Sequence, residues 1–153
     1  MASRSKASLS DEYETPKELF QLLCGYYGLA PELDVCATKE NKKCKYFITK
    51  EVDALEEDWL HDAWCNPPHS MTEKFVRKAY EQWKKHNNNI IMIIPANSMC
   101  TKYAHRYILQ KGVEFYPIIG RPRFLVKGKK SRFNSRNSYF VVIWREQHYG
   151  FEF

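Results

Sequence analysis

Apolar residues along this chain follow two patterns, short continuous runs and stripes at helical spacing. The runs at 90–94 and 139–144 are almost entirely apolar, which is typical of strands buried on both faces of a sheet. The segment after residue 70 instead places its apolar side chains on one helical face: Phe75, Val76, Ala79, Tyr80 and Trp83. Buried strands that alternate with amphipathic helices predict an α/β domain.

Weaker signals add shorter elements. Strands are expected at 32–37, 46–48, 63–65 and 113–119, and helices are expected from Thr15 onward and over 100–111. Thr15 is a natural N-cap, and Pro16 suits the first position of a helix. About nine residues separate the first two strands, so a crossover helix does not fit there and a turn or loop is expected.

The stretch Trp64-Cys65-Asn66-Pro67-Pro68-His69-Ser70 combines a strand end, a rigid turn and a helix start. The two prolines lack backbone donors and therefore cannot continue a strand ladder. Ser70 and Glu73 have the spacing of a capping box, which predicts that a helix begins there. The turn places a polar Asn and a His at the carboxyl end of a strand, the edge where open α/β sheets bind ligands.

This turn suits methylation of an exocyclic amine. The amino group of adenine is a poor nucleophile, and two acceptors, the side-chain oxygen of Asn66 and a proline carbonyl from Pro67 or Pro68, can bind its two hydrogens. The flat ring of His69 can stack on a base that has flipped out of the duplex. We therefore predict that these four residues are catalytic, although a plain strand–helix loop explains the same residues.

Three other segments are candidates for cofactor binding. The Thr15-Pro16 helix start can donate hydrogen bonds to a ligand carboxylate. Asp34, at the end of a short strand, can bind a ribose hydroxyl or an α-ammonium group, although the usual glycine-rich loop is absent. Asp53 can receive an adenine amino group while Leu55 packs on the ring. An ordinary capped helix, a strand end and an acidic turn are the structural alternatives.

A basic segment lies between the last two predicted strands. Its charged residues, interleaved with Phe124 and Phe133, suit phosphate contacts and base stacking, although a solvated loop would look similar. With Ser70, the predicted nucleic-acid contacts are Arg121, Arg123, Lys127, Lys129, Lys130, Arg132 and Arg136.

Composition sets the remaining expectations. The 153 residues carry a net charge of +6, compatible with a polyanionic partner. Residues 1–10 are small and polar and are expected to form a flexible tail, and the rest one domain. The five cysteines include no C-x-x-C pair, which favours reduced thiols in the cytoplasm. No apolar run has the length of a membrane span, and no metal site is predicted because the Cys and His spacings match no zinc pattern.

Taken together, the segments resemble the phage-type DNA adenine-N6-methyltransferases, a Dam-like family. The matching pieces cover about residues 12 to 144 in order: Glu14-Thr15-Pro16 with Leu19-Phe20, Leu33 to Thr38 with Asn41 and Cys44, Asp53-Ala54-Leu55 with Trp59, Trp64 to Ser70, Ile94-Pro95-Ala96, and Gly120 to Phe124. The resemblance implies a compact Rossmann-like methyltransferase sheet with its last strand antiparallel, S-adenosylmethionine as the methyl donor and double-stranded DNA as substrate. If the protein is viral, its compartment would be the host cytoplasm, and its role would lie in restriction–modification.

The same resemblance implies roles for individual residues. Thr15 and Pro16 would lie near the methionine carboxylate. Asp34, with Val35 and Cys36, would line the methionine and ribose region. The adenine of the cofactor would lie between Asp53, Ala54 and Leu55. The target amine would be bound by Asn66, Pro67 and Pro68.

Two features depart from the family pattern. His69 stands where the family typically has Tyr, and imidazole stacks more weakly and can take a proton near neutral pH. Residues 11–153 would form a single methyltransferase domain without a separate target-recognition domain, so a homodimer could read a palindromic site. Cytosine N4, RNA or a protein amide are alternative substrates, and an inactive nucleic-acid-binding module is the alternative from another class.

Overall fold

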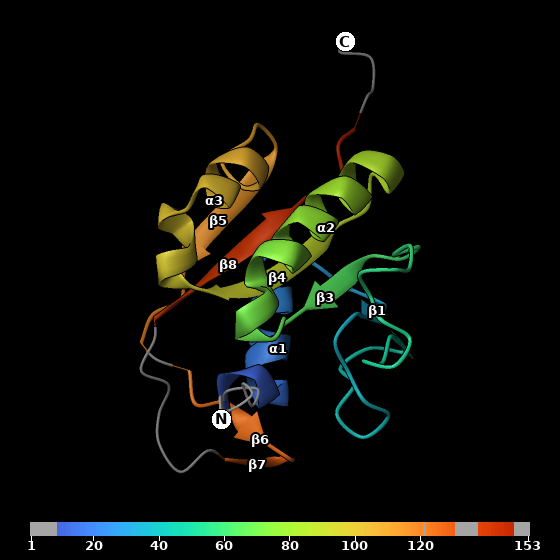
Figure 1. Ribbon diagram of the computed structural model, residues 1–153, viewed down its shortest axis with the longest axis vertical. Coiled ribbons are helices and arrows are strands. Elements are labelled where there is room, and N and C mark those ends of the chain that lie inside the picture. Colours follow the sequence, from blue (N-terminus) through green and yellow to red (C-terminus); the bar gives the residue numbers. More distant parts are fainter. Residues whose placement is uncertain (1–8, 121, 131–137, 149–153) are drawn as a thin grey trace, which may run out of the picture.

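A computed structural model of the chain describes residues 9–120, 122–130 and 138–148. Its centre is a six-stranded sheet in the order β2-β1-β3-β4-β8-β5 (Figure 1). These strands span Leu33–Asp34 (β1), Tyr46–Phe47 (β2), Ala63–Cys65 (β3), Ile90–Pro95 (β4), Val113–Pro117 (β5) and Tyr139–Trp144 (β8). The first four strands are parallel, and β8 lies antiparallel between β4 and β5. The predicted α/β sheet with an antiparallel last strand is confirmed.

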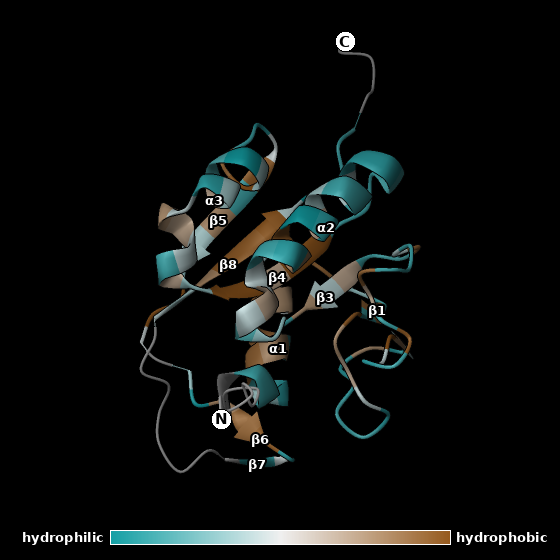
Figure 2. Cartoon of the chain, viewed as in Figure 1, coloured by the Kyte–Doolittle hydropathy of each residue, from teal (hydrophilic) through white to brown (hydrophobic). Residues whose placement is uncertain are grey.

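Helices cover both faces of the sheet. They are α1 (Lys17–Tyr26), α2 (Thr72–His86) and α3 (Lys102–Tyr107), with shorter 3-10 turns η1 (Leu9–Glu12), η2 (His69–Met71) and η3 (Ala96–Cys100). The helices α2 and α3 pack on one face and α1 on the other, so the sheet lies between two apolar layers. Figure 2 shows the central strands as the most hydrophobic part of the chain and α2 as amphipathic.

The apolar runs predicted as central strands form the core. All six residues of β4 are buried, and in β8 alternate side chains enter the two layers, with Val142 and Trp144 on the α2 side and Val141 and Ile143 on the α1 side. The predicted face of α2 is confirmed, since Phe75, Val76, Ala79 and Trp83 are buried and Tyr80 packs partly buried against the same layer. A strand that is apolar at every position fits a sheet covered on both sides.

Several predicted element ends were wrong. The strands at 32–37, 46–48 and 113–119 are shorter than expected, and the helix expected over 100–111 spans only Lys102–Tyr107. That helix begins late because Thr101 caps it, accepting a hydrogen bond from the Ala104 N–H at 3.1 Å. The chain between β1 and β2 contains no helix, as the short spacing predicted.

Both predicted side-chain caps were also wrong. Ser70 lies within η2, and both its backbone N–H and its hydroxyl donate to the Asp11 carboxylate, at 2.8 and 2.7 Å. Thr15 does not cap α1; Pro16 occupies the N-cap position, and the Thr15 hydroxyl accepts a bond from a distant side chain. In both cases the hydroxyl expected to cap a helix forms a hydrogen bond with a residue from a distant part of the chain.

No helix in the part of the chain that the structure describes is long and apolar enough to cross a membrane. The turn η1 begins at Leu9, so it includes the last two residues of the segment predicted as a tail. A small hairpin, β6 (Leu125–Val126) and β7 (Lys129–Lys130), lies apart from the main sheet, below α1 in Figure 1.

Candidate active site

The candidate active site lies where the parallel strands β1, β3 and β4 end. In β3 the Ala63–Cys65 segment is completely buried, and Asn66 and the two prolines follow directly. Cys65 pairs with Met92 in parallel register, β4 continues to Pro95, and Pro95 lines the same cavity as His69. The Sγ atoms of Cys36 and Cys65 lie 4.0 Å apart, which brings the loop after β1 to the same edge. The structure therefore gathers the predicted catalytic turn and part of the predicted cofactor segment.

Asn66 is fixed by the segment that precedes α1. Its Nδ2 donates to the Thr15 hydroxyl at 3.0 Å and to the Tyr13 carbonyl at 3.4 Å. Because the amide nitrogen is engaged in this way, the orientation of the amide is defined and its Oδ1 remains an acceptor. No described residue donates a hydrogen bond to that oxygen. This contact joins residues more than fifty positions apart, and no sequence pattern pointed to it.

The two prolines use their carbonyl groups differently. The Pro68 carbonyl accepts the Met71 N–H at 2.8 Å and so begins the turn η2. Within the described chain nothing donates to the Pro67 carbonyl, although the Pro67 side chain itself is buried. Two acceptors on consecutive residues, Asn66 Oδ1 and the Pro67 carbonyl, are thus left for a ligand with two N–H bonds.

His69 is half-buried and belongs to an aromatic cluster formed with Tyr13, Phe124 and Tyr139. Its Nε2 lies 3.0 Å from the Tyr139 hydroxyl, and its ring meets Tyr13 edge-on with centroids 5.7 Å apart. Burial lowers the pKa of His69, while Asp11 raises it by a smaller amount. The lowered pKa favours the uncharged form of the ring.

A cavity of about 310 Å³ adjoins His69 on the side of β4 and α3. Its walls come from η2, the start of α2 and the segment that follows β4: His69, Thr72, Pro95, Asn97, Ser98, Thr101 and Tyr103. This volume lies at the lower end of the range of small-molecule sites, about 300–1,000 Å³. The polar groups of Asn97, Ser98 and Thr101 give it hydrogen-bonding walls, and Tyr103 gives it an aromatic one.

Asp34 is almost completely buried and shapes the loop after β1. Its Oδ1 accepts the Cys36 N–H at 3.2 Å and its Oδ2 accepts the Lys43 N–H at 3.0 Å. Burial raises the pKa of this carboxyl, and the two backbone bonds and the Lys43 charge oppose that change. Val35 is buried beside it and Cys36 is partly exposed. With 3% of its surface exposed, Asp34 offers a ligand little direct contact. Its side chain mainly fixes the conformation of the loop after β1 through the two backbone hydrogen bonds.

The segment Asp53-Ala54-Leu55 forms a tight acidic turn. Asp53 adopts a φ of 71°, and its Oδ1 accepts the Leu55 N–H at 3.0 Å. Ala54 is buried, and its carbonyl accepts the indole N–H of the fully buried Trp59 at 3.0 Å. Asp53 and Leu55 remain partly exposed, so a carboxylate oxygen and an apolar side chain are both available there.

The basic hairpin, residues 122–130, contains a two-residue turn at Lys127 and Gly128, with φ values of 52° and 77°. Two positive φ angles are typical of the tight turn that joins antiparallel strands. Arg123, Lys127 and Lys129 are exposed, and Lys130 lies in β7. The other predicted contacts in this segment, Arg121, Arg132 and Arg136, lie outside the described residues, as does Phe133.

One expectation for this hairpin was wrong. Phe124 is 1% exposed, stacks on Tyr13 with centroids 5.1 Å apart and meets Tyr139 edge-on at 4.9 Å. It cannot stack on a base, because neighbouring aromatic rings already cover it. The side chain instead attaches the hairpin to the aromatic cluster that contains His69.

Sequence reasoning missed Tyr13 and Tyr139. Tyr139 opens the last apolar strand, and an aromatic residue with a polar tip at that position was an available signal. Tyr13 carried no such signal, since its contacts are all tertiary.

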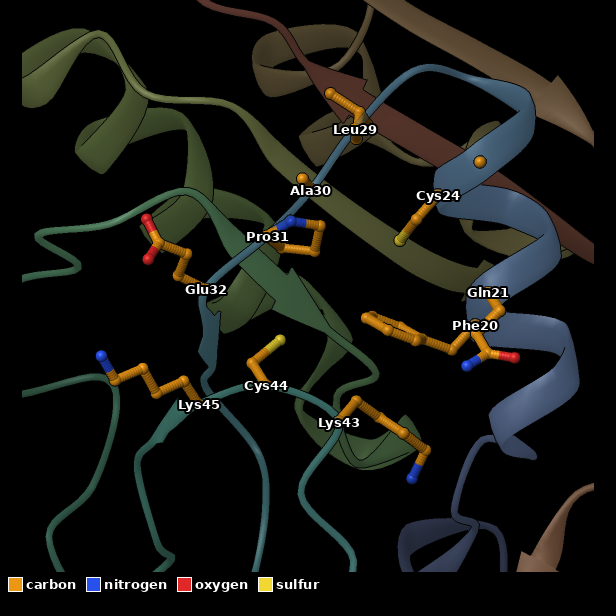
Figure 3. A pocket seen from close by; sticks show the side chains of 11 residues that line it. Phe20, Gln21, Cys24, Leu29, Ala30, Pro31, Glu32, Lys43, Cys44 and Lys45 are labelled. Atoms are coloured by element: carbon orange, nitrogen blue, oxygen red, sulfur yellow. The ribbon is translucent and has the colours of Figure 1, made fainter.

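A second cavity, of about 370 Å³, lies between α1 and the residues that precede β1 and β2 (Figure 3). Phe20, Cys24 and Cys44 turn toward its interior, and none of the predicted catalytic or cofactor residues lines it. Burial raises the pKa of both thiols to about 12, so they stay protonated. Within the described chain no group of three His, Cys, Asp or Glu side chains is placed to bind a metal ion.

Comparison with known proteins identifies relatives along most of the chain. The family described as DNA N-6-adenine-methyltransferase (Dam) matches residues 2–151. A DNA N-6-adenine-methyltransferase of Escherichia phage T1 is 40% identical over 93 residues, which are 60% of this chain and 38% of that protein. One of Haemophilus phage HP1 is 33% identical over 122 residues, 74% of this chain and 70% of that protein. The matched region thus spans well under half of the T1 relative.

A solved structure supports the fold. A candidate RNA methyltransferase from Pyrococcus horikoshii superposes with a TM-score of 0.54 at 14% identity, covering 92% of this chain and 88% of the other. At that identity the likeness shows a methyltransferase fold and carries nothing about substrate.

Proposed function

This chain belongs to the Dam family of DNA N-6-adenine-methyltransferases, as its sequence predicted, and we propose that it transfers a methyl group from S-adenosylmethionine to the N6 amino group of adenine in double-stranded DNA. Family and fold together imply the methyl donor. One structural observation carries the proposal for this chain's own residues: Asn66 Oδ1 and the Pro67 carbonyl are adjacent acceptors, and the Asn66 amide is fixed by Thr15.

The two acceptors explain how a weak nucleophile can react. The N6 nitrogen has two N–H bonds, and its lone pair is delocalised into the purine ring. Hydrogen bonds from these N–H groups to Asn66 and Pro67 favour a tetrahedral nitrogen and fix the direction of its lone pair. The catalytic contribution is positioning and electrostatics, and no strong base is required.

The cavity beside His69 supports a flipped-out target base. A base bound at the edge of this cavity would place one face against the imidazole and its ring nitrogens near Asn97, Ser98 or Thr101, while its amino group reaches Asn66 and Pro67. The Tyr139 hydroxyl sets the orientation of the imidazole, which compensates in part for a ring smaller than the tyrosine typical of the family. Pro68 does not compete for the amine, because its carbonyl is used in the turn.

The residues after β1 and around Asp53 fit the cofactor. S-adenosylmethionine supplies an electrophilic methyl group on a sulfonium. Cys36 and the backbone that Asp34 shapes would line its methionine and ribose portions, and the turn at Asp53, Ala54 and Leu55 would bind its adenine. The buried side chain of Val35 would support the part of the loop that lines the methionine and ribose portions. Thr15 and Pro16, at the entry to α1, would lie near the methionine carboxylate, although the Thr15 hydroxyl also accepts from Asn66.

The basic hairpin is the proposed DNA contact. Its exposed lysines suit phosphate oxygens, and its attachment through Phe124 places it beside the catalytic turn. Ser70 is exposed in the same region, but its N–H and hydroxyl are engaged by Asp11, so a contact from Ser70 to phosphate would have to displace that carboxylate.

A homodimer and a cytoplasmic site of action are further parts of this proposal. Leu22 and Tyr26 lie one turn apart on α1 and are 66% and 79% exposed, an apolar pair that a second copy could cover. All five cysteines are free thiols, as expected in a reducing compartment such as the cytoplasm of an infected host.

Methyl transfer with a labelled donor tests the proposed function. The purified chain is incubated with S-adenosylmethionine that carries a labelled methyl group and with mixed-sequence duplex DNA, and label on the DNA is counted. Binding of S-adenosylhomocysteine is measured in parallel by the rise in melting temperature. Labelled DNA is the expected result, and cofactor binding without labelled DNA would refute the proposed substrate.

A further inference from the structure

We infer that Glu14 is a positioning residue that couples DNA contact at the basic hairpin to the catalytic and cofactor-binding loops. The inference rests on the proposed function, since it concerns how the two substrates affect each other. Three consecutive residues, Tyr13 to Thr15, contact three segments that are far apart in the sequence. Figure 1 shows the hairpin of β6 and β7 beneath the start of α1, where these residues lie.

The first contact is with the hairpin. The Glu14 N–H donates to the Leu125 carbonyl at 2.7 Å, and the Leu125 N–H donates to the Glu14 carbonyl at 2.8 Å. The side chain adds a third bond, because the Gly128 N–H donates to Glu14 Oε1 at 3.0 Å. An isolated two-stranded hairpin is only marginally stable in water. Glu14 therefore fixes both the base of the hairpin and its turn, where Lys127 and Lys129 would meet DNA.

The second contact is with the loop after β1. Asn41 Nδ2 donates to Glu14 Oε2 at 3.0 Å. The Asn41 Oδ1 accepts the Thr38 N–H at 2.7 Å, so the amide cannot rotate without losing that bond. The same loop is fixed further on by Asp34, through Lys43. One carboxylate oxygen thus contacts the proposed cofactor loop and the other contacts the proposed DNA hairpin.

The third contact is with the catalytic turn, through the neighbours of Glu14. Asn66 Nδ2 donates to the Tyr13 carbonyl and to the Thr15 hydroxyl. A displacement of the Glu14 backbone therefore changes the orientation of the Asn66 amide. DNA that fixes the hairpin should favour the arrangement of the loop that binds the cofactor and the orientation of Asn66 that binds the target amine, and bound cofactor should favour the hairpin.

Such coupling is reciprocal. It can be measured as the ratio of the dissociation constant for DNA without S-adenosylhomocysteine to the dissociation constant for DNA with S-adenosylhomocysteine bound. We expect S-adenosylhomocysteine to tighten the binding of duplex DNA by at least about 5-fold, the lower end of typical coupling. Fluorescence anisotropy with labelled duplex DNA gives the two constants, and calorimetry with S-adenosylhomocysteine with and without DNA should give the same ratio.

Glu14→Gln is the informative variant. It preserves size but replaces one acceptor oxygen with an NH2 group, so the side chain can satisfy Gly128 or Asn41 but not both. We expect each ligand still to bind while the ratio falls toward one. Glu18→Gln, an exposed carboxylate in the first turn of α1, should keep the wild-type ratio. Asn41→Ala removes the contact between Glu14 and the loop, together with the bond from the Thr38 N–H to Asn41 Oδ1, and it should lower the ratio as Glu14→Gln does.

The outcomes separate this inference from the proposed function. A ratio near one in the wild type, or a wild-type ratio in a correctly folded Glu14→Gln variant, would overturn the coupling role. If Glu14→Gln lowers the melting temperature too far for binding studies, an unchanged ratio in Asn41→Ala would overturn it equally. Failure of the proposed function looks different, since wild-type protein would then transfer no methyl group to DNA.

Discussion

Replacing Asn66 by alanine removes the side-chain acceptor that the proposed mechanism assigns to the target amine. The change leaves the Pro67 carbonyl as the single acceptor, so the amine is no longer fixed at both N–H bonds. Removing one preorganised hydrogen-bonding partner from an active site lowers kcat by about 10²–10³, equivalent to about 2.7–4 kcal/mol. We expect a loss of that size in methyl transfer.

The same substitution has a smaller effect on stability. Two hydrogen bonds disappear, from Nδ2 to the Thr15 hydroxyl and to the Tyr13 carbonyl. At about 0.5–1.5 kcal/mol each, their loss lowers the free energy of unfolding by about 1–3 kcal/mol. Circular dichroism during urea unfolding measures this loss separately from catalysis. Binding of S-adenosylhomocysteine should change little, because Asn66 acts on the base side of the site.

Asn66→Asp is the matched control. It keeps an oxygen in the acceptor position, and the Thr15 hydroxyl can donate to the carboxylate in place of the lost N–H bond. Initial rates of methyl transfer should therefore fall less for the aspartate variant than for the alanine variant. An alanine variant with a rate within about threefold of wild type, far from the 10²-fold loss expected, would refute the assigned role of the side chain.

Three further predictions concern the surroundings of the site. Lys127→Asn with Lys129→Gln should weaken DNA binding and reduce the slope of log K against log salt by about 2, while Lys111→Gln, beyond α3, should leave the slope unchanged. Phe124→Ala should lower the free energy of unfolding by about 3–5 kcal/mol in a denaturant titration; a loss below 1 kcal/mol would contradict its burial. Burial lowers the pKa of His69 in the folded state, so the free energy of unfolding should fall as the pH drops below the unfolded-state pKa of about 6.5. His69→Gln should flatten this fall in urea titrations at several pH values. A variant with the pH dependence of the wild type would contradict the role of His69 burial.

Local sequence predicted the strand end and the turn at Asn66-Pro67-Pro68 well because their constraints are covalent. Proline without a backbone donor must end β3, and the apolar run of β4 fits only a strand covered on both faces. The polar partners could not be predicted in the same way. Ser70 donates a hydrogen bond to Asp11 and does not cap α2, and the Thr15 hydroxyl accepts a hydrogen bond from Asn66 and does not cap α1. Both contacts join residues more than fifty positions apart in the sequence.

Burial is the other quantity that the sequence does not give. Asp34 is predicted to bind a ribose hydroxyl or an ammonium group, and the structure adds that its carboxylate is buried and accepts hydrogen bonds from backbone amides. Phe124 reads as a stacking residue because it lies among arginines, yet Tyr13 and Tyr139 enclose it. Neither result follows from neighbours in the sequence, since the residues that cover these side chains come from other elements.

Mass spectrometry of nucleosides tests the central claim most directly. Duplex DNA of mixed sequence is incubated with the protein and S-adenosylmethionine, digested to nucleosides, and compared with a parallel reaction of Asn66→Ala. We expect N6-methyladenine in the wild-type reaction and almost none with the variant. N4-methylcytosine as the product, or no methylated nucleoside despite bound cofactor, would contradict the claim that this site methylates adenine in DNA.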